Sequence, residues 1–306
     1  MFDSRTLKRT ARLPVSPGRQ VAAVALAPDG RTVAATTQDG HLRFGDLRHP
    51  QRLGAPLAVT DWPVWSLAFS GDGRWIATAG DITSSHPPLQ LWDVRRRRLE
   101  NTALLSPRTA DPSDVTFSPN GTMLAAAVND PEGTTAIEIL SVPQLAQLKT
   151  LPTDAGTSVR FSPDGRLLVF GDVHGRVWLY DTHTWTPRGS PLVAHTGAVV
   201  TVSFSPDGRT LATTSHDGTT RLWEIPSGRP IGTALPGPAQ HYVAAAFVDG
   251  GTHLVTLDDN GHGNLWDIQP QSWARRACQI AGRTLTRTEW NAALSERTYA
   301  PACAAH

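Results

Sequence analysis

The sequence predicts an all-β fold in which a four-stranded sheet is repeated six times. The first observation is a turn motif, Ser-Pro-Asp-Gly-Arg at 205–209, that recurs at a nearly constant spacing. Counted from its Asp or Asn, the copies lie 43, 48, 44, 43 and 42 residues apart, at positions 29, 72, 120, 164, 207 and 249. The second observation is that each copy lies between two short runs of alternating apolar residues. A period of this length is typical of a repeat architecture and not of a single folded unit.

The first two strands of each repeat form a hairpin around this motif. In the fifth repeat the runs are 200–204 and 211–214, and alternation with a period of two indicates half-buried strands. The Pro presets φ for the turn and the Gly accepts a positive φ. We therefore expect one hairpin at every copy of the motif.

A third strand follows a second tight turn, and a fourth strand follows that. The third strand of the fifth repeat is 220–224, preceded by His216-Asp217-Gly218. Trp-Asp or Trp-Glu ends this strand in three repeats, at Trp92, Trp223 and Trp266, and the other three have Gly45, Leu140 and Tyr180. The fourth stretch carries Gly and Pro, which an outer edge strand tolerates.

Four strands per repeat with a recurring Trp-Asp resemble the WD-repeat β-propeller family. The resemblance covers roughly residues 20–268 and implies a β-propeller of six four-stranded blades, with seven blades as the alternative. The C-terminal tail, which contains Cys278 and Cys303, is similar to the short tail of bacterial members. We therefore expect a propeller over 1–268 and a small helical extension over 269–306 that packs on it. The two cysteines are either reduced or form a disulfide, and we favour reduced thiols for a cytoplasmic protein.

The two ends of the chain complement each other in the repeat pattern. Residues 2–7 align with 180–185, so the chain begins at the end of a third strand, and the sixth repeat has no fourth strand of its own. We expect an N-terminal strand over about residues 5–14 to complete the sixth blade and close the ring, which removes a free sheet edge. The alternative is that the rest of this repeat lies upstream.

The family resemblance also implies a structural hydrogen-bond network in the fifth repeat. Its members are His195, Ser215, Asp217 and Trp223. The residue types suit this role, because a buried indole N–H needs an acceptor and an imidazole needs a carboxylate to fix its tautomer.

Composition argues against two classes of partner, and the resemblance to WD-repeat proteins implies a non-catalytic binding protein. The net charge is +1, so no basic field suggests nucleic acid, and no apolar run is long enough for a membrane span. We expect a cytoplasmic monomer that binds a protein or peptide on one propeller face, as a scaffold or sensor in bacterial signalling or regulation. We expect no catalytic residue, cofactor or metal.

Six residues are the candidates for contact with a partner, because they lie at strand starts or in turns that should share one face. They are Trp65, His86, Asp114, Asp130, His174 and His216. The alternative function is a propeller hydrolase or lactonase with carboxylates such as Asp114 and Asp258 at the channel mouth. A shared metal site for His41, His174, His216 and His262 is disfavoured, since blades hold equivalent atoms on the order of 10 Å apart and metal bonds are about 2 Å. Arg95–Arg98 is a charge run that predicts a solvated loop or an anion-binding patch.

Overall fold

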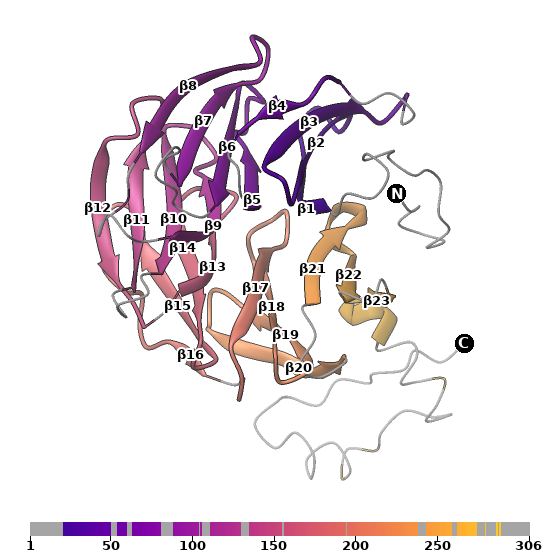
Figure 1. Cartoon of the computed structure of the whole chain (residues 1–306). Helices are drawn as coiled ribbons and strands as arrows, with labels where there is room; N and C mark the ends of the chain where they lie inside the picture. The colour runs from indigo at the N-terminus through magenta and orange to yellow at the C-terminus, as the bar shows by residue number, and fades with distance from the viewer. Residues whose placement is uncertain are drawn as a thin grey trace.

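A computed structural model of the chain shows six antiparallel sheets arranged in sequence order around a central axis (Figure 1). The structure describes residues 21–49, 54–59, 63–80, 88–103, 105, 111–129, 135–154, 156–193, 195–237, 243–258, 262–273, 279, 286 and 288. The predicted all-β propeller of six blades is confirmed.

The first three blades each have four strands, ordered from the axis outward. Blade 1 contains β1 (Val21–Leu26), β2 (Thr32–Thr37), β3 (His41–Asp46) and β4 (Leu57–Ala58). Blade 2 contains β5 (Val64–Phe69), β6 (Trp75–Gly80), β7 (Leu89–Asp93) and β8 (Arg98–Ala103). Blade 3 contains β9 (Asp111–Phe117), β10 (Met123–Asn129), β11 (Thr135–Ser141) and β12 (Gln147–Pro152).

The other three blades follow the same order, and the last has three strands among the described residues. Blade 4 contains β13 (Gly156–Phe161), β14 (Leu167–Asp172), β15 (Arg176–Asp181) and β16 (Leu192–Val193). Blade 5 contains β17 (Val199–Phe204), β18 (Thr210–Ser215), β19 (Thr219–Glu224) and β20 (Arg229–Pro236). Blade 6 contains β21 (Val243–Val248), β22 (His253–Asp258) and β23 (Gly263–Asp267), with a short 3-10 helix, η1 (Asp249–Gly251), between the first two.

The recurring turn motif has the chemistry that the hairpins need. In blade 5, Ser205 Oγ donates to Asp207 Oδ1 at 2.6 Å and accepts from the backbone N–H of Thr210 at 2.9 Å. Gly208 has φ +70°, a conformation that costs a glycine little. The same serine hydrogen bonds recur at Ser70, Ser118 and Ser162. These four hairpins are therefore specified locally.

The apolar core lies between neighbouring blades. In blades 2 to 6 the inner strand packs on the second and third strands of the blade before it. For example, Val115 and Phe117 of β9 lie in one cluster with Leu89 and Leu91 of blade 2. Val159 and Phe161 of β13 pack in the same way on Ile137 and Ile139 of blade 3. No blade buries its apolar faces alone, so the fold depends on stacking consecutive sheets.

The ends of the chain leave two predictions outside the described residues. Residues 5–14, expected to form the fourth strand of blade 6, and both Cys278 and Cys303 lie outside the described ranges. After β23, residues 270–273 are helical, and Trp273 packs against the cluster formed by Leu222 and Leu254 of blades 5 and 6. Across the described part of the chain, no helix has the length and apolar character required to span a bilayer.

Candidate functional site

A β-bulge occurs at the same place in five of the six inner strands. In β1, β5, β9, β13 and β17 the register with the second strand shifts by one residue near the start of the inner strand. A bulge leaves one residue without a partner and turns its side chain away from the regular alternation. The extra residues are Ala22, Trp65, Ser113, Thr157 and Val200.

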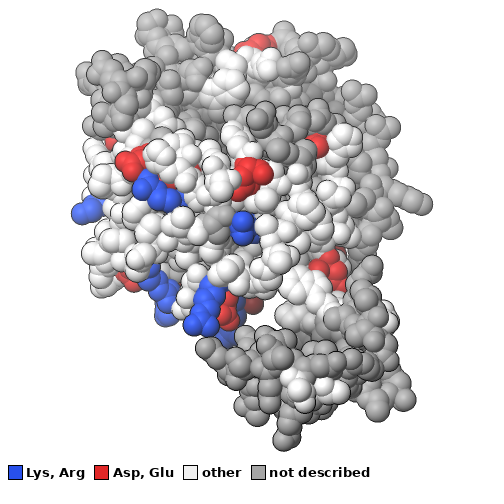
Figure 2. All heavy atoms as spheres, turned by 90° about the horizontal axis from the view of Figure 1, so that it is seen from below, with Lys and Arg blue, Asp and Glu red and all other residues white. Residues whose placement is uncertain are grey.

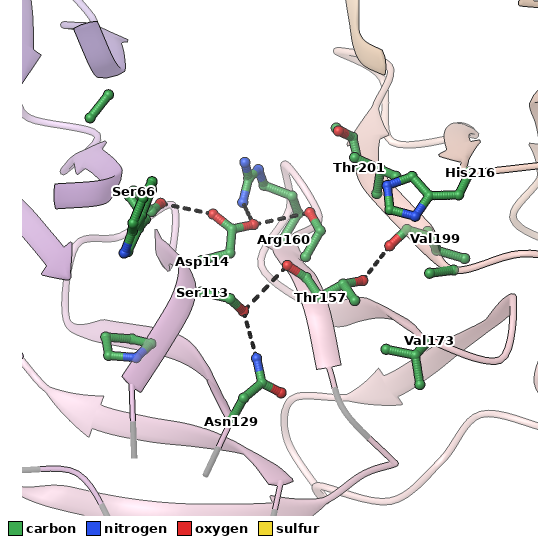
Figure 3. Close-up of a pocket in the computed structure, with 16 residues that line it drawn as sticks. Ser66, Ser113, Asp114, Asn129, Thr157, Arg160, Val173, Val199, Thr201 and His216 are labelled. Carbon is green, nitrogen blue, oxygen red and sulfur yellow. Dashed lines mark hydrogen bonds and ion pairs between the residues drawn. The ribbon is translucent and has the colours of Figure 1, made fainter. Parts of the chain in front are cut away.

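All five bulge residues line one cavity at the mouth of the central channel. This channel-mouth cavity has a volume of about 1110 Å³ (Figure 3). It lies beside the turns that join second and third strands, because the start of each inner strand pairs with the end of the second strand. Val173 and His216 come from two of these turns and complete the rim. The repeated bulge therefore builds a site from blades that are distant in sequence.

One buried carboxylate links three blades below the cavity. Asp114 of β9 accepts hydrogen bonds from Ser66 of blade 2 at 2.9 Å and from Ser158 of blade 4 at 3.0 Å (Figure 3). Its oxygens also accept from the backbone N–H groups of Val115 and Val159, and Arg160 Nη1 lies 2.5 Å from Oδ2. Five donors therefore surround the Asp114 carboxylate.

The wall beside Asp114 is polar and hydrogen-bonded within the protein. Asn129 Nδ2 donates to Ser113 Oγ at 3.1 Å and to the carbonyl of Gly156 at 3.2 Å. Thr157 donates to the carbonyl of Val199, which ties blade 4 to blade 5 (Figure 3). These bonds hold the bulged backbones in place.

The rim adds exposed apolar surface to this polar wall. Trp65 is 49% exposed although it belongs to a sheet strand, and Val173 on the opposite rim is also exposed. An exposed aromatic at a cavity mouth is a typical anchor for a binding partner. The cavity can thus take an apolar side chain and hydrogen-bond the backbone around it.

The six predicted partner residues separate into three groups. Trp65, Asp114 and His216 line the channel-mouth cavity, although the Asp114 carboxylate is engaged inside the protein. The backbone N–H of His174 donates to Asp172 at 2.9 Å, and its neighbour Val173 lines the cavity instead. His86 and Asp130 lie outside the described residues.

The hydrogen-bond network of blade 5 is centred on Thr213 and differs in one residue from the expected set. Thr213 Oγ1 lies 2.8 Å from His195 Nε2 and accepts from the indole N–H of Trp223 at 2.9 Å, while His195 Nδ1 lies 3.0 Å from Asp217 Oδ2. Ser215 does not join this series of hydrogen bonds, because its hydroxyl donates to the carbonyl of Gly197 and accepts from the N–H of Asp217. The expected role of Ser215 therefore belongs to Thr213, which lies two residues earlier on the same strand.

Burial and hydrogen bonding shift the pKa values of both titratable groups of this network. Burial lowers the pKa of His195 below its usual 6.5, and Asp217 opposes this shift without cancelling it. Burial raises the pKa of Asp217, but hydrogen bonds from Thr219, Thr196 and His195 outweigh it, so this pKa lies below its usual range. The imidazole is neutral, with Nδ1–H directed to Asp217 and Nε2 accepting from Thr213, as its partners require.

Charged groups outside the cavity form no large patch on the face that Figure 2 shows. Lys, Arg, Asp and Glu side chains are interspersed there, and most of the described surface is uncharged. In the Arg95–Arg98 run, Arg96 donates its N–H to Asp93 at 2.8 Å and Arg98 contacts Glu100 at 3.1 Å. Among the described residues no group of three His, Cys, Asp or Glu side chains could hold a metal ion.

Several cavity residues were missed by sequence reasoning. Ser113, Thr157, Arg160 and Val173 are in this group, together with Thr213 in blade 5. One signal could have found the bulge residues: each lies four residues before the last residue of its inner strand, ahead of the turn motif. Their shared direction follows only from the bulge, which the sequence does not display.

Comparison with known proteins agrees with the architecture. The sequence profile described as WD domain, G-beta repeat matches residues 54–83, 147–181 and 185–224. The second match begins with the outer strand of one blade and ends with the third strand of the next, so a sequence repeat spans two adjacent blades. A comparison with curated proteins gave no match. Three profile matches and six stacked antiparallel sheets together support a WD-repeat β-propeller.

Proposed function

We propose that this protein is a non-catalytic interaction module that binds a segment of a protein partner in the channel-mouth cavity. WD-repeat propellers are generally protein-interaction scaffolds. The observation that carries the proposal is the set of five bulge residues that converge on one cavity, with Trp65 exposed at its rim. The resemblance to bacterial WD-repeat proteins supports a place in signalling or regulation.

The chemistry of the cavity favours an uncharged, apolar peptide segment. Trp65 and Val173 supply apolar contact, and Ser113 and Thr157 supply hydroxyl groups. The charged pair of Asp114 and Arg160 is satisfied within the protein. A partner that inserts an aromatic or aliphatic side chain therefore meets no unpaired carboxylate.

The hydrolase alternative has less support in this cavity. Asp114 is the one carboxylate among the described residues that line it, and its oxygens accept hydrogen bonds from five donors. A general base needs access to the proton that it removes from water or substrate. The position of Asp114 is better suited to joining blades.

Binding of selected peptides tests the proposal. Peptides would be selected from a displayed random library on the immobilised full chain, and their Kd measured for wild type and Trp65→Ala. We expect Trp65→Ala to weaken binding by roughly 10- to 100-fold, because it removes an aromatic anchor at the rim. Trp65 is half exposed, so the variant should keep its Tm.

The matched control is Leu148→Ala, which removes an exposed apolar side chain from the outer strand β12. Peptides should bind this variant as tightly as wild type. Equal affinity for wild type and Trp65→Ala would place the binding surface elsewhere. Ester or lactone turnover that Asp114→Asn abolishes would replace the scaffold with the hydrolase.

A further inference from the structure

Arg160 presents one edge of its guanidinium group to the channel-mouth cavity. Its Nη1 lies 2.5 Å from Asp114 Oδ2 and donates to the carbonyl of Val159 at 2.6 Å. No described residue accepts a hydrogen bond from Nε or Nη2, and the side chain is 38% exposed and lines the cavity. The Nε–H and Nη2–H groups of an arginine form a planar fork that fits the two oxygens of a carboxylate.

This fork is held in place before any ligand binds. Asp114 fixes Arg160 on one side, and Ser66 and Ser158 of the two neighbouring blades donate to Asp114 in turn. A guanidinium that is already held by two hydrogen bonds loses little conformational entropy on binding. Figure 3 shows the nitrogens that do not contact Asp114 directed away from its carboxylate. A ligand carboxylate on that edge would be separated from Asp114 by the guanidinium.

The repeat itself does not require an arginine at this position. Arg160 is the residue before the last of its inner strand, and the corresponding residues of β1, β5, β9 and β17 are Ala25, Ala68, Thr116 and Ser203. Small side chains are therefore sufficient for the packing of an inner strand. The hydrogen bonds of Asp114 do not depend on Arg160 either, because four other groups donate to this carboxylate.

The fork lies close to the aromatic side chain at the rim. Ser66, which follows Trp65 in β5, donates to one oxygen of Asp114, and Arg160 contacts the other oxygen. The exposed indole of Trp65 and the fork of Arg160 are thus positioned through the same carboxylate. A ligand that carries an apolar group next to a carboxylate can contact both. The last residue of a polypeptide has this chemistry, because its side chain and its terminal carboxylate are attached to one Cα.

We propose that the segment bound in the channel-mouth cavity is the C-terminal end of a partner protein, with its terminal carboxylate on Nε and Nη2 of Arg160. This inference rests on the function proposed above and specifies the kind of segment. The apolar rim favours uncharged side chains, and a segment without charged side chains has one carboxylate to offer, at its C-terminus. The last side chain would contact Trp65.

Two displayed peptide libraries test which kind of segment binds. Both contain the same random peptides, which end freely in one library and are followed by carrier residues in the other. Selection on the immobilised full chain should enrich the free-ended library, with apolar residues at the last position. The best peptide would then be synthesised as a free acid and as a C-terminal amide. We expect wild type to bind the acid about 10- to 100-fold more tightly, since the amide loses a bidentate pair of charge-assisted hydrogen bonds.

A variant at position 160 assigns this preference to the arginine. Arg160→Gln should bind the acid and the amide with nearly equal Kd, whereas a purely structural role would weaken both by the same factor. Arg160→Lys keeps the charge beside Asp114 and lacks the fork, so it should reduce the preference by about threefold or more. The matched control is Arg229→Gln on the exposed outer strand β20, which should keep the wild-type preference. Circular dichroism and Tm would show that each variant is folded.

The possible results separate this inference from the proposed function. Equal binding of acid and amide by wild type, with weaker binding of both by Trp65→Ala, would overturn the C-terminal carboxylate and retain the site. Affinities that Trp65→Ala leaves unchanged would overturn both. A preference that depends on an internal Asp or Glu of the peptide, and is lost on its replacement by Asn or Gln, would make a side chain the source of the carboxylate and overturn the C-terminal end.

Discussion

Thr213 orders two side chains of blade 5 with a single hydroxyl group. It accepts from Trp223 and donates to His195, and both of those side chains are buried. Because Thr and Val have nearly the same shape, Thr213→Val removes the hydrogen bonds and keeps the packing. We expect the free energy of unfolding to fall by about 1–3 kcal/mol, since a buried N–H and a ring nitrogen lose their partners.

Urea denaturation followed by circular dichroism measures this loss. Thr150→Val on the exposed strand β12 is the control and should leave the free energy of unfolding within about 0.5 kcal/mol of wild type. Ser215→Ala, a few residues away, should leave the link between Trp223 and His195 intact. If Thr213→Val and Thr150→Val had equal midpoints, the network would not stabilise the blade.

His195 makes stability depend on pH in a defined window. Burial holds its folded-state pKa below the unfolded value of 6.5, so the folded state favours the neutral ring. Its contribution is fully present above about pH 6.5 and is lost as pH falls through the lower folded-state pKa. We expect the urea midpoint of wild type to decrease when the pH is lowered from 7.5 to 5.5.

The variant His195→Gln isolates this contribution. The variant should be less stable than wild type at pH 7.5. Its urea midpoint should decrease less than that of wild type when the pH is lowered from 7.5 to 5.5. The other histidines are common to both proteins, so the difference reports on His195 alone. Parallel pH profiles for the two proteins would exclude the assignment.

At the scale of the element, close contacts between strands decide which small residues the blades require. Gly171 of β14 lies against Val199 of the next inner strand, and a Cβ at position 171 would meet Val199 Cγ1 at 2.4 Å. Both residues lie in sheet strands with little freedom to move. We expect Gly171→Ala to destabilise the fold by about 1–3 kcal/mol through overpacking.

A double-mutant cycle separates this clash from other effects of alanine. Val199→Ala makes room for the new methyl group, so Gly171→Ala should cost less in that background than in wild type. Thermal unfolding of the four proteins measures the coupling. Additive losses would show that position 171 does not act through Val199.

The bulges are the element-scale feature on which the site depends. Each inner strand would alternate regularly without them, and the extra residue would belong to one of the two packed faces. The bulge instead directs Trp65 and its four counterparts to the channel mouth. β21 has regular register throughout its described pairing with β22, and no described residue of blade 6 lines the cavity.

At the scale of the molecule, Asp114 joins three blades through hydrogen bonds that add to the apolar contacts between them. Ser66 and Ser158, its partners, lie 48 and 44 residues away. We expect Asp114→Ala to lower the free energy of unfolding by about 2–4 kcal/mol. This is somewhat less than for a fully buried ion pair, because Arg160 is partly exposed.

The control is Asp46→Ala, which removes a surface ion pair with Arg31 inside one blade. Its expected cost is below about 1 kcal/mol. Scanning calorimetry of both variants makes the comparison. Similar losses would mean that Asp114 does not link the blades beyond what a surface pair contributes.

Prediction from the sequence succeeded where the cause is local. The turns at Ser205–Asp207 and their copies carry their own hydrogen bonds, so the hairpins could be placed from the residues alone. Trp65 and His216 were placed at the cavity because strand starts and turns share a face. Asp114 was located correctly but interpreted as a free channel group, because its partners are far away in sequence. Ser215 was taken from the family resemblance, and only the structure shows that Thr213, two residues earlier on the same strand, reaches Trp223 and His195.

By itself, the sequence determined the repeat, the strands and the all-β propeller, since turn residues and period-two patterns act over a few residues. Only the tertiary structure decided where the bulges fall and which side chains meet at the channel mouth. These features depend on how sheets separated by forty or more residues pack together.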